Sequence, residues 1–280
     1  MVGKREKQRK NRLRLPGALL ALTAAVLLLS SGRPSGVAAD SPAEAPEPAR
    51  QMVPAAAILA EPEAEQPPEE QPSAQEQPWA PVPESEAVED TYFDDVVFLG
   101  DSRTDGFRLY SGLETGTYLC ATGATVESVF TKAVETGQGK LPLLDALAET
   151  PCGKIYVMLG VNELGWNGTD IFRDQCGRMI DRIRSDHPEA VLVLQSIIPV
   201  SRKQDEKGTY VNNARVDAYN TVLRELAEEK DCPFVNVAEA VTDGDGFLRA
   251  DWNFDGVHLN QAGCRAWLSY LRTHPVTAEN

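Results

Sequence analysis

The chain has few of the side chains that bind metals or form disulfides. It contains three histidines and five cysteines, with no Cys-x-x-Cys pair among 280 residues. The motifs G-x-x-x-x-G-K, H-E-x-x-H and G-x-G-x-x-G are also absent, so a phosphate-cradling loop and a zinc site have no support in the sequence. An odd number of cysteines leaves at least one unpaired. We therefore expect no metal, no cofactor and no disulfide framework.

Basic residues are scarce relative to acidic ones, and the formal net charge is −15. Within residues 91–280 there are 18 Lys and Arg against 28 Asp and Glu. Affinity for nucleic acid depends on basic side chains that neutralise phosphates. The composition therefore argues against a nucleic-acid partner.

The exception to this acidity is the N-terminus. Residues 1–14 contain seven Lys and Arg against one Glu, and residues 15–29 are almost wholly apolar. This pattern predicts that residues 1–31 are a basic n-region followed by a signal peptide or a signal-anchor helix. Two alternatives are equally consistent with the sequence. The signal is cleaved after Ala39, or it stays uncleaved and residues 15–29 anchor the chain in the membrane. In both, we expect an extracytoplasmic chain that is either membrane-anchored or secreted.

Residues 32–90 have the composition of a linker. They contain twelve of the nineteen prolines, and from Asp40 onward they carry thirteen acidic residues against the single basic residue Arg50. Such a segment buries too little apolar surface to offset the entropy of the chain, so we expect it to be a disordered spacer. The folded domain is then predicted to span residues 91–280.

Short apolar runs alternate with helical patterns along this domain. The predicted strands cover residues 96–100, 117–121, 154–160, 190–198 and 233–238, and the helical patterns cover 126–136, 170–187, 213–230 and 260–274. Continuous apolar runs are typical of parallel strands that are buried on both faces. The alternation predicts an α/β fold, a three-layer α/β/α sandwich with a five-stranded parallel sheet and right-handed crossovers.

In such sheets, ligands bind outside the carboxyl ends of the strands. Ser102 follows the first predicted strand, Gly123 the second and Asn162 the third. The segment DWNFDGVHLN, residues 251–260, lies between the fifth strand and the last helix. We therefore expect these four parts of the chain to meet on one rim.

A serine needs a neighbouring base before its hydroxyl becomes a nucleophile. Of the three histidines, we expect His187 to be an exposed cap at a helix end and His274 to lie in a frayed terminus. His258 lies on the predicted rim, and Asp255 precedes it by three residues. A carboxylate at that position can orient the imidazole and stabilise its charged form. The pattern predicts a triad of Ser102, His258 and Asp255.

Acyl transfer also needs donors that stabilise the developing oxyanion. We assign the backbone N–H of Ser102 at a helix N-terminus, the backbone N–H of Gly123, and the side-chain amide of Asn162. Taken singly, the glycine and the asparagine are also typical of ordinary turns. Their order relative to the triad favours the oxyanion hole. We expect Asp101 to be structural and to accept backbone N–H groups in the serine loop.

Four segments resemble the conserved blocks of the SGNH, or GDSL-type, hydrolases: GDSRTDG, ATGATV, GVNELG and DGVHLN. The resemblance covers about residues 92–273. It implies a flavodoxin-like sandwich and metal-free ester hydrolysis or, in some members, acyl transfer. It also implies that Ser102 is the nucleophile, that Gly123 and Asn162 complete the oxyanion hole, and that Asp255 and His258 complete the triad. The absence of G-x-S-x-G argues against an α/β-hydrolase with a nucleophile elbow.

The sequence departs from the family pattern at Arg103, where leucine is common, and at Glu163, where aspartate is frequent. We assign these two residues, with Trp166 and Trp252, as candidate substrate-binding residues. The tryptophans flank the third and last blocks and are suited to stack on a sugar ring, although packing around the rim accounts for them equally well.

These observations predict a bacterial-type extracytoplasmic serine esterase that hydrolyses a carboxylic ester through an acyl-enzyme. The first expected substrate is an O-acetyl group on a cell-wall or other glycan, because an exported domain on a spacer faces such polymers. A lipase is less favoured, since no long apolar lid is evident. An acyltransferase on the same triad and a non-catalytic glycan-binding or adhesion module are the alternatives.

Overall fold

The computed structural model describes residues 80–137 and 139–276. At the centre of this part of the chain is a five-stranded parallel sheet, as predicted. Its strands, in spatial order, are β2 (Thr117–Cys120), β1 (Val96–Gly100), β5 (Lys154–Met158), β6 (Val191–Gln195) and β7 (Phe234–Val235). This is the flavodoxin-like order, which reverses direction between β1 and β5. In sheets of this order, ligands bind at the carboxyl ends of the strands beside such a reversal.

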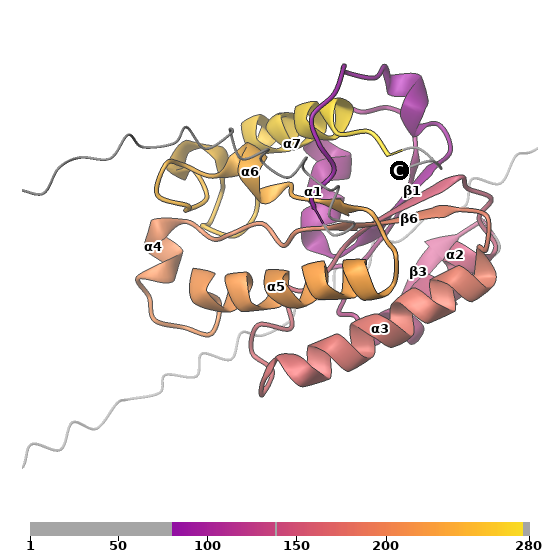
Figure 1. The fold of residues 1–280 in the computed structure, drawn as a ribbon, viewed down its shortest axis with the longest axis horizontal. Helices are drawn as coiled ribbons and strands as arrows, with labels where there is room; N and C mark the ends of the chain where they lie inside the picture. Colours follow the sequence, from indigo (N-terminus) through magenta and orange to yellow (C-terminus); the bar gives the residue numbers. More distant parts are fainter. Residues whose placement is uncertain (1–79, 138, 277–280) are drawn as a thin grey trace, which may run out of the picture. The chain divides into compact units, whose positions relative to one another are not determined.

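Helices cover both faces of the sheet (Figure 1). One face carries α2 (Leu143–Ala148), α3 (Thr169–Asp186) and α5 (Asn213–Glu229). The other carries α1 (Ser102–Tyr110), α6 (Ala238–Val241) and α7 (Gln261–Thr273). The predicted three-layer sandwich is therefore confirmed. The shorter elements are the 3-10 helices η1 (Asp90–Phe93), η2 (Ser128–Phe130) and η3 (Ala250–Trp252), and the one-turn helix α4 (Arg202–Asp205).

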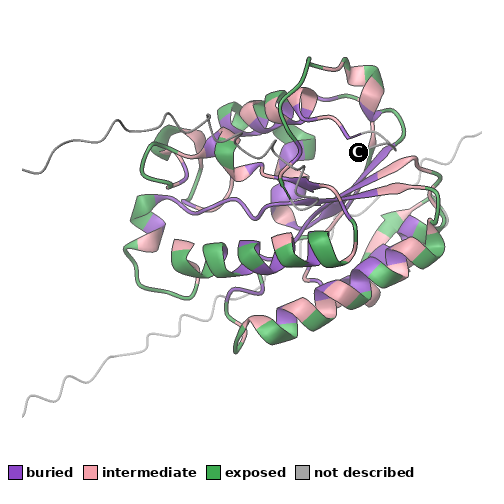
Figure 2. Cartoon of the chain, in the orientation of Figure 1, coloured by how far each residue is buried: buried purple, intermediate pink, exposed green. Residues whose placement is uncertain are grey.

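Each strand contributes to two separate cores because successive side chains point to opposite faces. Val97 and Leu99 of β1 pack with the α3 and α5 side, whereas Val96 and Phe98 pack with the α1 and α7 side. All five residues of β1 are buried, and the sheet is the most buried layer in Figure 2. This double burial explains why the strands are continuous apolar runs in the sequence.

The helix predicted over residues 126–136 is wrong. The chain there forms η2 and then an antiparallel hairpin of β3 (Ala133–Thr136) and β4 (Gly139–Pro142). Gly139 has a φ of +112°, which the turn of this hairpin requires and which other residues rarely adopt. Glu135 and Lys140 form a cross-strand ion pair at 3.2 Å. The apolar residues of this segment fitted a helical period, but the glycines beyond it favour a turn.

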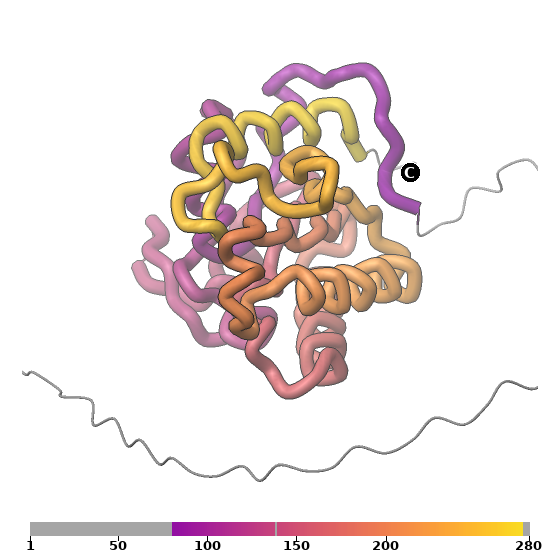
Figure 3. Tube along the Cα trace, turned by 90° about the vertical axis from the view of Figure 1, so that its left-hand side faces the viewer, coloured from indigo at the N-terminus to yellow at the C-terminus, as the bar shows by residue number. Residues whose placement is uncertain are grey.

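The domain begins earlier than predicted. We assigned residues 80–90 to the disordered linker, but they run beside α7 and form hydrogen bonds to α7 and β7 (Figure 3). Val82 is 7% exposed and donates its backbone N–H to Phe234 O at 2.8 Å. The backbone N–H groups of Ser85 and Val88 donate to carbonyls in the last turn of α7. This short extended segment contains prolines and acidic residues. It nevertheless forms backbone hydrogen bonds to the domain, two of them from its valines.

The predicted signal segment, residues 1–31, and most of the predicted linker lie outside the described residues. Within residues 80–137 and 139–276, no helix combines the length and apolar character that crossing a membrane requires.

Candidate active site

The loop between β1 and α1 places Ser102 at the rim of the sheet. Asp101 is the N-cap of α1, and its carboxylate accepts the backbone N–H of Arg103 at 2.8 Å. A Cβ at Gly100 would lie 2.0 Å from Thr104 Oγ1 and 2.7 Å from Met158 O, so only glycine fits this sharp strand-to-helix turn. Because Asp101 already caps the helix, the half-buried Ser102 hydroxyl is available for another partner.

That partner is His258. Ser102 Oγ lies 3.0 Å from His258 Nε2, and His258 Nδ1 lies 2.7 Å from Asp255 Oδ2. The serine and the histidine are separated by 156 residues in the sequence. The predicted convergence of the three side chains is therefore present, in the order hydroxyl, imidazole and carboxylate. The arrangement has the geometry by which an imidazole accepts the proton of a hydroxyl.

The carboxylate of Asp255 is held by a dense set of donors. Its Oδ1 accepts the backbone N–H groups of Val257 and His258, both at 2.9 Å, while Oδ2 faces the imidazole. Partial burial alone would raise the pKa of Asp255, but these hydrogen bonds and the nearby imidazole outweigh it and lower the pKa to about 2. Asp255 is therefore ionised at neutral pH and can stabilise a positive charge on His258.

The three predicted oxyanion donors come together at one corner. The Asn162 amide donates to Asp101 Oδ2 at 3.2 Å and to Ala124 O at 2.9 Å, so it links the loops that follow β5, β1 and β2. Gly123 is exposed and has a φ of +69°, a conformation that favours glycine. Within the described residues, the backbone N–H groups of Ser102 and Gly123 donate to no other group. These two donors are free to bind a ligand, whereas the Asn162 amide must exchange one of its bonds.

Asp101 has the structural role that we expected. It is 1% exposed, and it joins the first turn of α1 to Asn162. Burial raises the pKa of this carboxyl above its ordinary value, although the neighbouring guanidinium of Arg103 acts in the opposite direction.

The assignment of Arg103 and Glu163 to substrate binding is wrong. Arg103 is 3% exposed and Glu163 is 0% exposed, so neither side chain reaches a ligand at the rim. Glu163 Oε1 accepts the backbone N–H of Val126 at 2.7 Å, and burial raises its pKa to about 8. Both residues directly follow a rim residue in the sequence, but in a helical turn each successive side chain is rotated by about 100°. The prediction assumed that a residue next to a rim residue also faces the rim, and this assumption fails for Arg103 and Glu163.

The two tryptophans are half-buried. Trp166 packs against the core on the α3 and α5 side, and Trp252 packs against the opposite core with the Arg249 guanidinium 4.2 Å from its ring. The aromatic side chains that stand out from the surface near the triad are others. Phe254 is 63% exposed, and its ring lies 5.6 Å from that of Tyr110.

The sequence analysis did not identify the exposed pair of Tyr110 and Phe254. Phe254 lies four residues before His258 and donates its backbone N–H to His258 O at 2.9 Å, so it belongs to the same loop. Tyr110 ends α1, the helix that begins at Ser102. The spacing of Phe254 from His258 was visible in DWNFDGVHLN, but its exposure depends on how the loop folds.

The other two histidines lie away from the triad. His187 caps the C-terminus of α3, as expected, but it is half-buried, with its Nε2 2.9 Å from Leu147 O. The expectation of a frayed end at His274 is wrong, because this residue is 7% exposed and stacks on Tyr270 with ring centroids 3.7 Å apart. All five cysteines are free.

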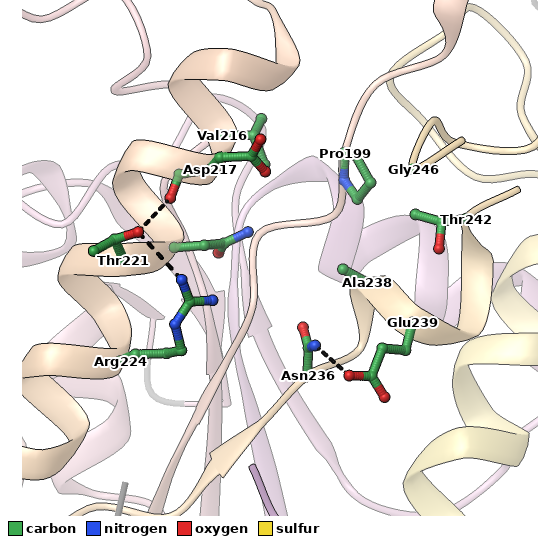
Figure 4. A pocket seen from close by; sticks show the side chains of 11 residues that line it. Pro199, Val216, Asp217, Thr221, Arg224, Asn236, Ala238, Glu239, Thr242 and Gly246 are labelled. Atoms are coloured by element: carbon green, nitrogen blue, oxygen red, sulfur yellow. Dashed lines mark hydrogen bonds between the residues drawn. The ribbon is translucent and has the colours of Figure 1, made fainter. Parts of the chain in front are cut away.

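Two hollows lie near the carboxyl edge of the sheet. One, of about 550 Å³, adjoins the triad and is lined by residues 253–256, which include Asp255 and Phe254, and by part of the segment 201–207. The other, of about 300 Å³, lies between α5 and α6, with Arg224 and Glu239 on opposite walls (Figure 4). Asp255 is the one member of the Ser–His–Asp arrangement that lines the first hollow, and none lines the second, so Ser102 opens into neither of them.

Comparison with known families agrees with the fold. A family model, that of the GDSL-like lipase/acylhydrolase family, matches residues 98–266. The match runs from β1 into α7 and includes all five residues assigned to the triad and the oxyanion hole. The chain belongs to this family of acylhydrolases, which confirms the resemblance found in the sequence. A search of curated proteins finds no match.

Several solved structures are similar to this chain. A protein from Streptococcus pneumonia described as a platelet activating factor is 24% identical, with a TM-score of 0.51 over 63% of this chain and 81% of that one. A GDSL-like lipase from Bacteroides thetaiotaomicron is 16% identical, with a TM-score of 0.47 over 65% and 87%. A carbohydrate esterase family 3 protein from Talaromyces cellulolyticus is 16% identical, with a TM-score of 0.45 over 63% and 93%. At 24% identity, the likeness to the first of these structures concerns the fold alone.

Proposed function

We propose that this protein is a serine esterase that hydrolyses a carboxylic ester through a covalent acyl-enzyme. One observation carries the proposal: Ser102 Oγ lies 3.0 Å from His258 Nε2, and the other nitrogen of that ring lies 2.7 Å from an ionised Asp255. A glycan-binding module without catalysis would have no need for these three groups in contact. Membership in an acylhydrolase family agrees with the same reaction class.

In the acylation half-reaction, His258 Nε2 accepts the proton of Ser102 as Oγ attacks the ester carbonyl carbon. The carbonyl π electrons move to the oxygen and form a tetrahedral oxyanion. The imidazolium is stabilised by Asp255, and it then gives its proton to the departing alkoxide as the C–O bond breaks. The products of this half-reaction are a free alcohol and an acyl group on Ser102.

Deacylation repeats the sequence with water in place of the serine. His258 removes a proton from water, the hydroxide attacks the acyl carbon, and the second tetrahedral intermediate collapses. The proton returns from His258 to Ser102 Oγ, and a carboxylic acid leaves. A sugar hydroxyl in place of this water would make the same site an acyltransferase.

The oxyanion in both halves is stabilised by the N–H groups of Ser102 and Gly123 and by the Asn162 amide. The first two have no competing acceptor within the described residues, so they are ready for a ligand. The amide exchanges its longer bond, 3.2 Å to Asp101, for the substrate oxygen. Preformed donors of this kind are among the largest single contributions to acyl transfer.

For the substrate, we propose a short acyl ester on a glycan, with an O-acetyl group as the first case. The exposed ring of Phe254, the residue before Asp255, is suited to the apolar face of a sugar ring, and Tyr110 at the far end of α1 packs against this ring. The basic and apolar segments of residues 1–29 support an extracytoplasmic location, where such polymers occur.

Hydrolysis of p-nitrophenyl acetate by the purified full-length chain tests the reaction class. We expect activity in the wild type, a loss of about 10⁴-fold or more in Ser102→Ala, and no loss in Ser185→Ala, an exposed serine on α3. Circular dichroism must show that both variants are folded. An S102A variant as active as the wild type would refute the proposal. Release of acetate from an acetylated glycan, compared with transfer to a glycan acceptor, separates hydrolase from transferase.

A further inference from the structure

The residue after the nucleophile carries a buried guanidinium that joins two distant segments. Arg103 Nη1 donates to Ile198 O at 2.6 Å, beyond the end of β6, and Nε donates to Val257 O at 3.2 Å. Val257 is the immediate neighbour of His258. Arg103 therefore ties the first turn of the serine helix to the histidine loop and to the edge of the sheet.

The bond from Arg103 to Val257 is one of two hydrogen bonds, within the described residues, that join α1 to the loop carrying Asp255 and His258. Within residues 80–137 and 139–276, the hydrogen bonds from α1 to the loop 253–258 are the Ser102–His258 contact itself and the bond from Arg103 to Val257. The loop is otherwise held from its other side, where the backbone N–H of Ser201 donates to Gly256 O at 2.9 Å. The guanidinium of Arg103 thus holds the His258 loop from the side of α1, where Ser102 lies.

Burying a cation at this position costs free energy of folding, because the charge loses its hydration. Burial lowers the pKa of Arg103 to about 10, while the carboxylates of Asp101 and Asp255 act in the opposite direction. A side chain needed only to fill the space would cost less if it were apolar. What arginine adds is a rigid set of donors that binds two carbonyls at once.

We infer that Arg103 is a positioning residue of the esterase site, which holds the His258 loop at hydrogen-bond distance from Ser102 through its bonds to Val257 O and Ile198 O. The inference rests on the proposed function, since it gives His258 a role as base. Arg103 itself touches no substrate, because its side chain is buried beneath the rim.

Three variants of the full-length chain test this role. Arg103→Met removes both hydrogen bonds and the charge at similar length. Arg103→Lys keeps the charge and reaches one carbonyl. Arg108→Met removes an exposed arginine of the same helix, which forms a salt bridge with Asp105, and serves as the matched control. For each, KM and the kcat per folded molecule are measured for p-nitrophenyl acetate, with the folded fraction taken from near-UV circular dichroism.

We expect kcat of R103M to fall by about 100-fold, the scale of a misplacement of about 1 Å in a reacting group, while KM changes little. R103K should recover part of this loss, and R108M should match the wild type. A uniform loss of folded protein with an unchanged kcat per folded molecule in R103M would overturn the inference. If R103M does not fold, R103K decides alone: wild-type kcat in this variant would overturn it.

The two proposals fail in different ways. If S102A remains active, the esterase mechanism is wrong, and Arg103 has no base to position. If S102A is inactive while R103M and R103K retain the kcat of the wild type, the mechanism stands and the positioning role of Arg103 is refuted.

Discussion

Asp255 holds His258 through both of its carboxylate oxygens. Oδ1 accepts the backbone N–H of His258 at 2.9 Å, and Oδ2 faces the ring Nδ1 at 2.7 Å. The first bond fixes where the histidine lies along the loop, and the second fixes how its ring is turned. The hydrogen bonds that position the imidazole therefore also keep Asp255 ionised, with a pKa of about 2.

Replacing Asp255 by asparagine should reduce kcat by about 10³- to 10⁴-fold while the fold survives. The asparagine oxygen can still accept the two backbone N–H groups, but its amide presents a donor to Nδ1. Nδ1 must then become an acceptor, Nε2 carries the hydrogen, and the ring cannot take the proton of Ser102. The measurement is kcat for a short p-nitrophenyl ester.

Asp251→Asn is the matched control, because it removes an exposed carboxylate four residues earlier in the same segment. We expect D251N to keep the activity of the wild type. Equal activities of D255N and D251N would show that the carboxylate does not orient the histidine.

Loss of the Asn162 amide should lower kcat by about 10²- to 10³-fold, the scale found when one oxyanion donor is removed. Asn162→Ala also breaks the bonds to Asp101 and Ala124 O, so thermal unfolding must be recorded beside the kinetics. Asn167→Ala, an exposed asparagine of the same loop, is the control. If N162A loses stability but not kcat per folded molecule, the amide has only a structural role.

The buried carboxyl of Glu163 should make stability depend on pH. Burial raises its pKa from 4.5 to about 8, so between these values the folded chain keeps a proton that the unfolded chain has released. This contribution to the free energy of unfolding is complete below pH 4.5 and is lost as pH rises to about 8, by a few kcal/mol in order of magnitude.

Glu163→Gln mimics the protonated side chain, so it should remove this part of the pH dependence. The measurement is urea unfolding of both chains at several pH values between 4.5 and 8. The wild type should lose stability relative to E163Q as pH rises. Parallel curves for the two chains would mean that Glu163 is ionised in the folded state.

The segment 80–90 should contribute measurably to stability. A chain that begins at residue 91 lacks the burial of Val82 and three backbone hydrogen bonds, from Val82, Ser85 and Val88. We expect it to unfold with a free energy about 3 kcal/mol below that of a chain beginning at residue 80. Guanidinium unfolding compares the two chains. Identical midpoints would show that the segment is not docked in solution.

Much of the fold was predictable because it follows from strong local patterns. Parallel strands buried on both faces are continuous apolar runs, and β1, β5 and β6 were found within a few residues of their ends. The long helices α3, α5 and α7 were equally clear from their apolar period. The hairpin of β3 and β4 was missed because four-residue strands have too few alternations to outweigh a chance helical spacing.

The convergence of Ser102, His258 and Asp255 was predictable for a different reason. The rule that ligands lie at the carboxyl ends of parallel strands converts sequence order into position, which brings Ser102 and His258 to one rim. The rule does not say which way a side chain turns. Arg103 and Glu163 were therefore placed at the surface although both point inward, and the exposure of Phe254 was missed.

The most direct test of the account is whether Ser102 becomes covalently modified by a reagent that reacts only with an activated serine. The full-length chain is incubated with a fluorophosphonate and analysed by intact and peptide mass spectrometry. We predict one adduct, on the peptide that contains Ser102, with a rate that falls sharply in His258→Ala. Labelling of another residue, or equal labelling of Ser102 in H258A, would contradict the proposed serine–histidine mechanism.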